Sequence, residues 1–319
     1  MAANTDYITR ANAAALVSEE MSRIVYAELP KKSAAMQLMR IIPMGKTISR
    51  LPVSSALATA SWLSPTAYTP GTASNATWEN KTVTAEELMT IVPIPRAVFE
   101  DSDFDMAAQI VPQALTAMGA AIDAAVLFGT NAPTSFATSI YESTDTDVEA
   151  TSGFALTHDA TSGFDVEMSD LMAKPEAAGY EVNGFICAPA TKATLRRLRD
   201  SVGQPIFQPS LIVGTPATLY GEPIIYCANG AWNATSATIM CGDWTQGILG
   251  LRQDVQVRIF EEGVISDSGS VTSNLMQADM VAVRITMRVG FAVANPITVT
   301  GGSYGSQYPW ATMHPTGWS

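Results

Sequence analysis

A long helix with almost no charge is the feature of this sequence that most restricts its fold. Apolar residues recur at every third or fourth position over 103–128, which predicts one helix, on the order of 39 Å long at 1.5 Å per residue. Asp123 is its one charge after the first turn and is predicted to lie off the apolar face, while Pro112 is expected to bend or divide the helix. The predicted core face consists of Phe104, Val111, Leu115, Met118 and Ile122. A helix this apolar needs an extended apolar partner surface.

The residues before this helix, 46–95, carry no helix signal. The segments TISRLPVSSAL and TWENKTVTAEELMTIVPIP are typical of strands, and the turn-rich segment SWLSPTAYTPGTASNA separates them, so a long β-hairpin is predicted. An isolated two-stranded ribbon is only marginally stable in water, and nothing else in the pattern supplies a sheet to cover it. We therefore expect the hairpin to lie on a neighbouring subunit. The residues expected to make that contact are Trp62, Tyr68, Trp78, Glu79 and Lys81.

Charge is scarce along the whole chain. Of its 319 residues, 47% are apolar and only 15% are charged, against roughly 25% charged in ordinary soluble domains. Much of the surface is therefore expected to be covered by other subunits or by uncharged polar side chains. The net charge of −12 argues against tight binding of nucleic acid, which needs clustered Lys and Arg. The one dense basic run, Lys192 with Arg196, Arg197 and Arg199, is predicted to be a solvated helix face.

The sequence lacks the motifs of catalytic, cofactor and metal sites. His158 and His314 have no nucleophile or ligand pattern around them and are expected to be exposed. The acidic run 100–105 does not fit a calcium loop, because Met106 and Pro112 stand where that loop needs Gly and Glu. Helix capping explains these acids instead. We therefore predict a protein that is not an enzyme and holds no cofactor and no metal.

Signals for secretion or for a membrane are not found either. The first twenty residues contain no apolar core, so no signal peptide is predicted, and no segment is expected to span a bilayer. The three cysteines, Cys187, Cys227 and Cys241, lie in apolar stretches without metal-type spacing. They are predicted to be buried free thiols, which fits synthesis in a reducing compartment.

The second half of the chain alternates strands with two helices. Helices are expected in FDVEMSDLMAKPEAAGY, with Pro175 near its middle, and after the strand of NGFICAPATKATLRRLRDS. Further strands are expected in TLYGEPIIYC, ATIMCGDW, QGILGLR, QDVQVRIFEEG and NLMQADMVAVRITMRVGFAVANPITVT. In the last of these, apolar residues alternate from Val281 to Val293, which predicts a half-buried strand of unusual length. The terminal aromatic residues Tyr304, Tyr308, Trp310 and Trp318 are expected to dock on another subunit or to fray.

The order of these elements resembles that of the major capsid proteins of tailed phages, which have the Hong Kong 97-type fold. The resemblance is carried by Trp62 in the loop and by WENKTVTAEELMTIVPIPRAVFEDSDFDMAAQI, IDAAVLFGT and AAGYEVNGFICAPATKATLRRLRDSVGQPIFQPS. TLYGEPIIY, CGDWTQGILGLRQDVQVRIFEEG and MVAVRITMRVGFAVANPITV follow in the expected order. Each motif is weak alone, but together they cover about residues 40 to 300.

This resemblance implies an α+β fold with a defined division of the chain. The implied parts are an N-terminal arm (1–45), an extended β-hairpin loop (46–96), a peripheral domain (97–185) with its spine helix (103–128), an axial domain (186–250), return strands of the peripheral domain (251–300) and a C-terminal tail (301–319). The extended loop would lie on the adjacent subunit. The axial domain would meet its copies at the centres of hexamers and pentamers.

The implied function is structural. The chain would assemble with itself, as hexamers and pentamers, into an icosahedral shell that encloses double-stranded phage DNA without reading its sequence. A separate scaffolding protein, a portal and possibly decoration proteins would be its partners, with no membrane involved. The protein would be found in the virion capsid after assembly in the cytoplasm of the host bacterium. Alternatives are an encapsulin, which is a cellular compartment with the same fold, and, less favoured, a β-rich enzyme or a secreted adhesin.

The sequence also departs from parts of the family's pattern. Members that crosslink their subunits carry a lysine on the extended loop, whereas no lysine occurs between Lys46 and Lys81. Covalent crosslinking is therefore not expected. Some members begin with a long helical scaffolding segment, which this chain lacks, so scaffolding is expected to be a separate protein or to have been removed. Pro112 is not typical of the spine helix.

Overall fold

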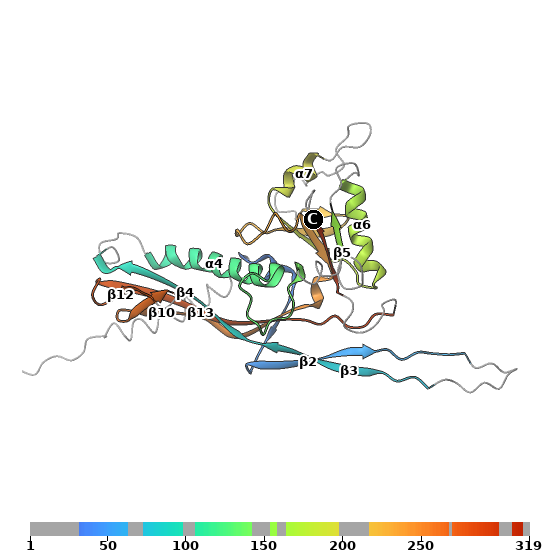
Figure 1. Ribbon diagram of the computed structural model, residues 1–319, viewed down its shortest axis with the longest axis horizontal. Helices are drawn as coiled ribbons and strands as arrows, with labels where there is room; N and C mark the ends of the chain where they lie inside the picture. Colours follow the sequence, from blue (N-terminus) through green and yellow to red (C-terminus); the bar gives the residue numbers. More distant parts are fainter. Residues whose placement is uncertain are drawn as a thin grey trace, which may run out of the picture.

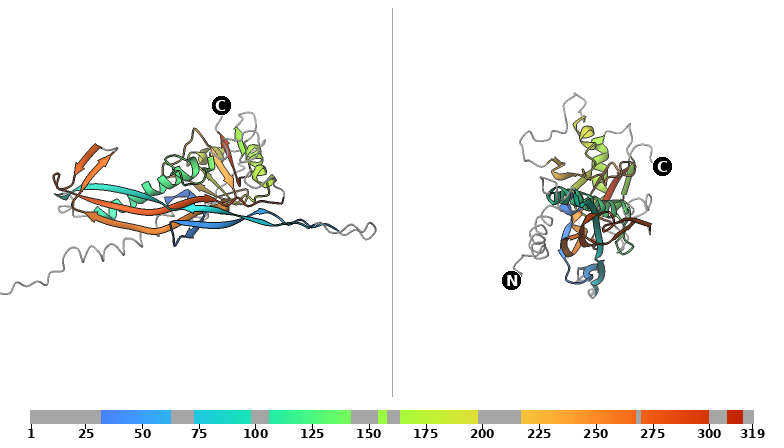
Figure 2. Two further views of the ribbon diagram at one scale, coloured as in Figure 1. Left: turned by 60° about the horizontal axis from the view of Figure 1, so that its bottom comes forward. Right: turned by 90° about the vertical axis from the view of Figure 1, so that its left-hand side faces the viewer.

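The computed structural model describes residues 32–62, 73–97, 106–141, 154–157, 164–197, 217–267, 270–299 and 308–314. Two larger sheets lie at different ends of an elongated body, and a two-stranded hairpin extends away from it (Figure 1). A smaller ribbon of β11 (Val264–Asp267) and β12 (Ser270–Asn274) projects at the end of the body opposite the tip of the hairpin (Figure 2). Helices and strands are thus both present, as the predicted α+β fold requires.

A four-stranded sheet supports the long helix. Its order is β1-β10-β13-β4, made of β1 (Arg40–Pro43), β10 (Gly247–Phe260), β13 (Met280–Val293) and β4 (Glu86–Pro95). Strand β1 is parallel to β10, and the other two pairs are antiparallel. Helix α4 (Met106–Phe128) lies along this sheet (Figure 1), and Leu115 and Met118 of the helix share one buried cluster with Ile285 of β13. This contact supplies the extended apolar partner that the helix needs.

Pro112 does not divide the helix, since α4 is one continuous element from Met106 to Phe128. Pro112 lies on its exposed side, where water can bind the carbonyl that proline leaves without a donor. By length and hydropathy alone, Ile110–Phe128 would suffice to cross a membrane, which corrects our expectation that no segment is apolar enough. More than half of that segment, 56%, is buried inside the protein. The apolar character of α4 is therefore explained by packing in the core.

The central strand β13 is fully buried on one face and partly buried on the other, which is more burial than its alternating sequence predicted. On the face toward α4, Val283 and Ile285 are 1% exposed. On the other face, Ala282 and Thr286 are also buried, Arg284 and Arg288 are half-buried, and the end of the hairpin crosses near Gly290. An alternating sequence indicates which face of a strand carries the large apolar side chains. It does not show whether the opposite face is exposed to water.

The predicted hairpin is present, but it is shorter than predicted. Strand β2 (Ile48–Ala56) pairs with β3 (Thr77–Thr84), with Ile48 opposite Thr84. The predicted second strand divides at Ala85, and its remainder, β4, leaves β2 to pair with β13. Residues 86–95 therefore belong to the four-stranded sheet and not to a loop over 46–96. The hairpin extends well beyond the body (Figure 2), and Tyr68 lies outside the described residues.

The second sheet has six strands in the order β5-β14-β9-β6-β8-β7. These are β5 (Phe154–Thr157), β14 (Trp310–His314), β9 (Ile239–Gly242), β6 (Gly184–Cys187), β8 (Glu222–Tyr226) and β7 (Thr218–Leu219). The helices α6 (Phe164–Ala177) and α7 (Thr191–Arg197) accompany it, and the 3-10 turn η1 (Trp244–Gln246) leads into β10. Pro175 lies near the end of α6 and not near its middle. Met168 and Leu171 of α6 pack on Phe185 and Met313 of the sheet in a separate core cluster.

The last strand corrects our expectation of a C-terminal tail over 301–319. Strand β14 lies inside the sheet, parallel to β5 and antiparallel to β9. Trp310 is fully buried and its ring centroid lies 6.1 Å from that of Trp244, so it neither docks on another subunit nor frays. His314 is buried as well, against the expected exposure, and its Nδ1 lies 2.8 Å from the carbonyl oxygen of Ser236. The six-stranded sheet thus combines strands from within the predicted axial domain, 186–250, with strands that come before it and after it in the sequence.

Candidate assembly surfaces

The hairpin has one covered face and one open face. Residues alternate between the faces of a strand, and Val53 and Val83, 7% and 1% exposed, point to the covered side. The opposite side carries exposed residues of both strands: Ile48, Arg50, Pro52, Trp78, Asn80 and Thr82. We call this set the outer face of the hairpin. Trp78 is 68% exposed and Ile48 is 54% exposed, so a single chain leaves a large apolar area in water.

The structure places the predicted contact residues at different parts of this hairpin. Trp78 lies on the outer face, opposite Ser54, and Trp62 is completely exposed at the end of the described part of the loop. Glu79 and Lys81 alternate with Trp78 and therefore lie on the other face, with Glu79 exposed and Lys81 half-buried. Their contacts with another subunit stay a prediction.

Two glycines hold the base of the hairpin against the four-stranded sheet. Gly250 and Gly290 are opposite each other in β10 and β13. A Cβ on Gly290 would stand 2.5 Å from the carbonyl oxygen of Thr84, and a Cβ on Gly250 would stand 2.9 Å from Cγ1 of Val83. Both values are far below ordinary carbon contacts. The missing side chains therefore let the hairpin cross close to the sheet, which fixes where it leaves the body. The sequence analysis did not single out these glycines.

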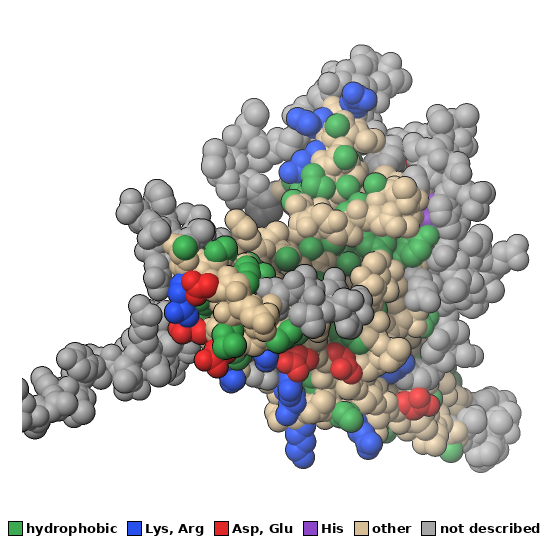
Figure 3. All heavy atoms as spheres, turned by 60° about the vertical axis from the view of Figure 1, so that its left-hand side comes forward, with side chains coloured by type: hydrophobic (Ala, Val, Ile, Leu, Met, Phe, Trp, Pro, Cys, Tyr) green, Lys and Arg blue, Asp and Glu red, His purple; other side chains and the backbone are tan. Residues whose placement is uncertain are grey.

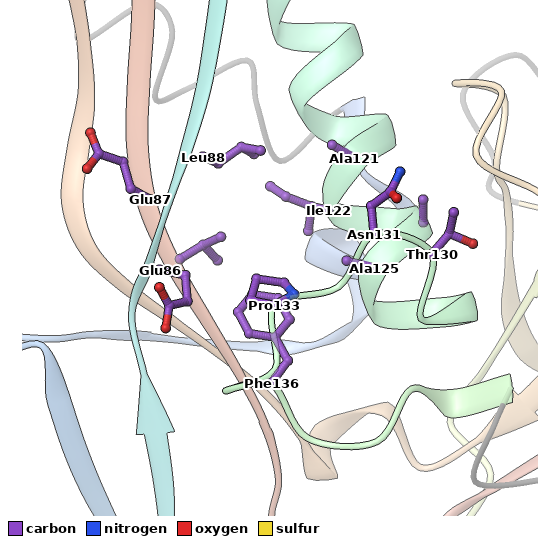
Figure 4. Close-up of a pocket in the computed structure, with 12 residues that line it drawn as sticks. Glu86, Glu87, Leu88, Ala121, Ile122, Ala125, Thr130, Asn131, Pro133 and Phe136 are labelled. Atoms are coloured by element: carbon purple, nitrogen blue, oxygen red, sulfur yellow. The ribbon is translucent and has the colours of Figure 1, made fainter. Parts of the chain in front are cut away.

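A pocket lies beside the start of β4. It has a volume of about 240 Å³ and is lined by Glu86, Glu87 and Leu88 of β4, Ala121, Ile122, Ala124 and Ala125 of α4, Val289 of β13, and Thr130, Asn131, Pro133 and Phe136 after the helix. Figure 4 shows the strand on one side and the helix with the following loop on the other. Glu86 accepts a hydrogen bond from the Ser135 hydroxyl at 2.6 Å, and Glu87 lies 3.6 Å from Arg288. The pocket therefore combines apolar walls with two carboxylates.

A buried carboxylate joins the described start of the arm to the spine helix. Ser33 is the N-cap of α2 (Ala34–Leu38), and its hydroxyl donates to Asp123 at 2.6 Å. The backbone N–H groups of Ala34 and Ala35 donate to Asp123 at 2.8 and 3.0 Å. From a third segment, the side-chain amide of Asn229 donates at 2.6 Å. We call this group the Asp123 junction.

Asp123 is buried, although the helix periodicity placed it off the apolar face. Burial raises the pKa of the Asp123 carboxyl above its ordinary value, and the hydrogen bonds that it accepts lower it. The face that periodicity did predict is buried at its described positions, Val111, Leu115, Met118 and Ile122. Phe104 lies outside the described residues. Helix α4 therefore has two buried sides, of which one faces the sheet and the other receives α2.

The basic helix α7 lies at the far end of the six-stranded unit. Lys192, Arg196 and Arg197 are exposed there, and Figure 3 shows basic side chains gathered at this end. The Lys192 ammonium lies 4.0 Å from the centroid of the Tyr226 ring, and none of the three cations forms an ion pair with another described residue. Arg199 lies outside the described residues. This surface has the character of a solvated helix face.

Reactive or metal-binding groups do not gather at any of these surfaces. Within the described ranges, no group of three or more His, Cys, Asp or Glu side chains is placed to hold a metal. Cys187, Cys227 and Cys241 are free and buried, as predicted. Burial raises the pKa of Cys187 and of Cys227 to about 12, so both thiols stay protonated near neutral pH. The surfaces described above are suited to protein contacts.

Known proteins resemble this chain over most of its length. A family model described as the phage capsid family matches residues 13–302. The major capsid protein of Staphylococcus phage 80alpha is 24% identical over 280 residues, which is 86% of this chain and 81% of that protein. A solved structure from Microbacterium phage Oxtober96 has a TM-score of 0.75 at 28% identity and covers 89% of this chain and 91% of its own. One from Mycobacterium phage Cain has a TM-score of 0.75 at 26% identity and covers 98% and 100%.

Proposed function

Because the chain belongs to the phage capsid family and has the Hong Kong 97-type fold of a major capsid protein, we propose that its hairpin joins each subunit to the next in the shell. The outer face of the hairpin carries this proposal: Trp78 and Ile48 are exposed on a ribbon too thin to have a core. Burying a large aromatic side chain stabilises by roughly 2–3 kcal/mol, less the cost of ordering the loop. Trp and Tyr are also the residues that dominate interface energies.

The body of the next copy offers a matching surface. The pocket beside β4 has apolar walls that can receive the Trp78 ring, and the Glu86 carboxylate, whose hydrogen-bond partner is the neutral Ser135 hydroxyl, suits Arg50, the one charge on the outer face of the hairpin. Because hairpin and pocket are different surfaces, the contact is head-to-tail, and a head-to-tail contact closes into a ring when its rotation allows. Hexamers and pentamers are such rings, and together they build an icosahedral shell. Nothing in the comparisons favours an encapsulin.

Removing the two tryptophans tests the hairpin contact. Trp62→Ala with Trp78→Ala should leave the far-ultraviolet circular dichroism of the subunit unchanged, because both rings are exposed in the single chain. Shells should fail to form in electron micrographs, or should disrupt at lower temperature. Met276→Ala is a control, because Met276 is 72% exposed but lies at the turn between β12 and β13, away from the hairpin. Shells of unchanged thermal stability in the double variant would refute the contact, and so would unfolding of the isolated subunit.

A cysteine pair tests the pocket itself. Ser54→Cys, which lies opposite Trp78 in the hairpin and leaves that ring in place, combined with Ala121→Cys should form disulfides between copies, visible as a ladder on a non-reducing gel after mild oxidation. Ser54→Cys combined with Ala117→Cys is the control, because Ala117 is exposed on α4 one turn before Ala121 and does not line the pocket. Normal shells without a ladder, or equal ladders in both variants, would reject the pocket and leave the shell function intact.

The remaining partners follow from the shell function. We propose that the shell encloses double-stranded DNA without sequence-specific contacts, which the net charge of −12 supports because an acidic lining does not hold DNA tightly. A scaffolding protein, a portal and decoration proteins would be separate chains, and assembly would occur in the host cytoplasm. Sedimentation of the chain with and without its scaffolding protein tests this. A stable monomer at all salt and protein concentrations, even with scaffold, would contradict the proposal.

A further inference from the structure

The Asp123 junction brings together three segments that are distant in sequence. Ser33 and the following two amides come from the arm, the carboxylate comes from the middle of the spine helix, and Asn229 comes from the loop after β8. That loop belongs to the six-stranded unit, because the N–H of Cys227 donates to the carbonyl of Cys187 in β6 at 2.9 Å. One buried carboxylate is thus the common acceptor for two separate parts of the fold.

Every strong partner of this carboxylate is a donor. The Ser33 hydroxyl itself accepts from the N–H of Met36 at 3.2 Å, so its hydrogen is directed to Asp123. The Asn229 amide has its orientation fixed, because its oxygen accepts from the N–H of Ala231 at 3.1 Å and its nitrogen also donates to the carbonyl of Lys32 at 2.9 Å. Because all of these groups are donors, an ionised carboxylate can accept from every one of them, whereas no neutral side chain of the same size can.

Loss of one donor group therefore affects the other. If the loop moves away from α4, Asp123 loses the hydrogen bond from Asn229. The buried carboxylate then keeps only its hydrogen bonds to the arm, which satisfy its charge less well. If the arm leaves, the charge is opened to water and no longer holds the loop. We propose that Asp123 couples the anchoring of the arm segment 32–38 to the position of the six-stranded unit, so that displacing either one loosens the other. Such coupling is reciprocal by thermodynamic necessity.

The proposal concerns the single chain and does not rest on the arrangement of subunits in the shell. It explains why the spine helix keeps a charge in its most buried half, where an apolar residue would otherwise pack without the cost of desolvation. It also gives Asn229 a role as a polar contact between the six-stranded unit and the arm, beside the apolar contact of Leu38 with Gly184 of β6. The surrounding described groups include no cation that pairs with Asp123, so the carboxylate depends on these hydrogen bonds.

Hydrogen exchange on the full-length protein tests the coupling, since each side has its own reporter. The amides of Ala34 and Ala35 report on the arm, and the amide of Ala231, which donates to Asn229, reports on the loop. Ser33→Ala removes a donor on the arm side only. It should speed exchange at Ala231 on the order of tenfold, as expected when a hydrogen bond to a charged group is lost.

Two further variants make the result decisive. In an Asp123→Asn background, Ser33→Ala should affect Ala231 much less, because the shared acceptor is gone and only the direct bond from Asn229 to the Lys32 carbonyl still joins the two segments. Asn229→Ala should speed exchange at Ala34 and Ala35. Asn233→Ala is a matched change in the same loop region and should not, because the Asn233 side chain accepts its hydrogen bonds from Thr235.

Three outcomes would overturn the proposal. The first is unchanged exchange at Ala231 in Ser33→Ala. The second is an effect of Ser33→Ala on Ala231 that is undiminished without Asp123. The third is equal effects of Asn229→Ala and Asn233→Ala on the arm amides. If Asp123→Asn fails to fold, Ser33→Ala is compared with Gln37→Ala, which changes an exposed residue of α2. Only Ser33→Ala should then speed exchange at Ala231 in the loop.

Discussion

Adding a single methyl group at Gly290 should displace the base of the hairpin. A Cβ at this position would lie 2.5 Å from the carbonyl oxygen of Thr84 and 2.9 Å from its carbonyl carbon. Thr84 cannot yield easily, because it pairs with Ile48 and the next amide donates to the carbonyl of Thr47 at 2.8 Å. The hairpin must therefore shift on the order of 1 Å to restore ordinary contact, and overpacking of this kind costs about 1–3 kcal/mol.

Two other glycines provide graded controls for Gly290→Ala. A Cβ on Gly250 would meet the sulfur of Met44 and Cγ1 of Val83, which are side-chain ends, and a methionine side chain can move aside. A Cβ on Gly45 would meet nothing within 4 Å. The destabilisation should therefore be largest for Gly290→Ala, smaller for Gly250→Ala and close to zero for Gly45→Ala.

Two measurements check this order. Thermal unfolding of the subunit should rank the three variants as above, and electron micrographs should show that Gly290→Ala impairs shell assembly most, because a displaced base redirects the whole hairpin. If Gly290→Ala unfolds and assembles like Gly45→Ala, the close crossing is not what fixes the hairpin. If Gly250→Ala is the most damaging, side chains and not the Thr84 backbone limit the approach.

Three shorter predictions follow from burial and from the lysine positions. Cys187 and Cys227 should resist alkylation in native protein at pH 8 and react after unfolding. Rapid alkylation of the native protein would contradict their burial. Because the pKa of both thiols rises from 9.0 to about 12 on folding, the folded state binds more protons. The free energy of unfolding should therefore fall as pH rises from about 9 to about 12. Mature particles boiled in detergent should release one band near 33.8 kDa, whereas a ladder that survives reductant would implicate Lys46 or Lys81. Trp310→Ala should cost about 3–5 kcal/mol in thermal unfolding, since the ring is fully buried; unchanged stability would show that β14 is dispensable.

Local patterns of the sequence were enough to predict the peripheral half of the fold. The spine helix and the long strand β13 each bury a regular set of apolar positions, so periodicity identified them. The hairpin was identified by two strand-like segments around a turn-rich stretch. The predicted end of the hairpin was wrong, because the chain pairs with β2 before Ala85 and with β13 after it. This change of partner leaves no mark on the strand-like sequence pattern. Pairing depends on which neighbour is present, and that information is spread over the whole chain.

The six-stranded sheet shows a different limit. Strands β5 and β14 have four and five residues, which is too short for a periodic signal. They pair with each other although about 150 residues separate them, so only the assembled core reveals that β14 is internal. Trp310, Ala311 and Met313 were the available hint, but isolated apolar residues near a chain end are as typical of a frayed tail. His314 was predicted to be exposed for the same reason, because β14, to which it belongs, was not recognised as an internal strand.

Asp123 shows why the remaining contacts of the spine helix were not predictable. A helical-wheel reading assumes one apolar partner, and with the sheet as that partner a charged residue away from it is expected to meet water. In the structure a second partner, α2, covers that side, and α2 supplies the hydroxyl of Ser33 and two free amides at its own N-terminus. Those amides need an acceptor as much as the carboxylate needs donors. Neither requirement is visible from one segment alone, so the pairing of Ser33 with Asp123 can be recognised only when both are seen together.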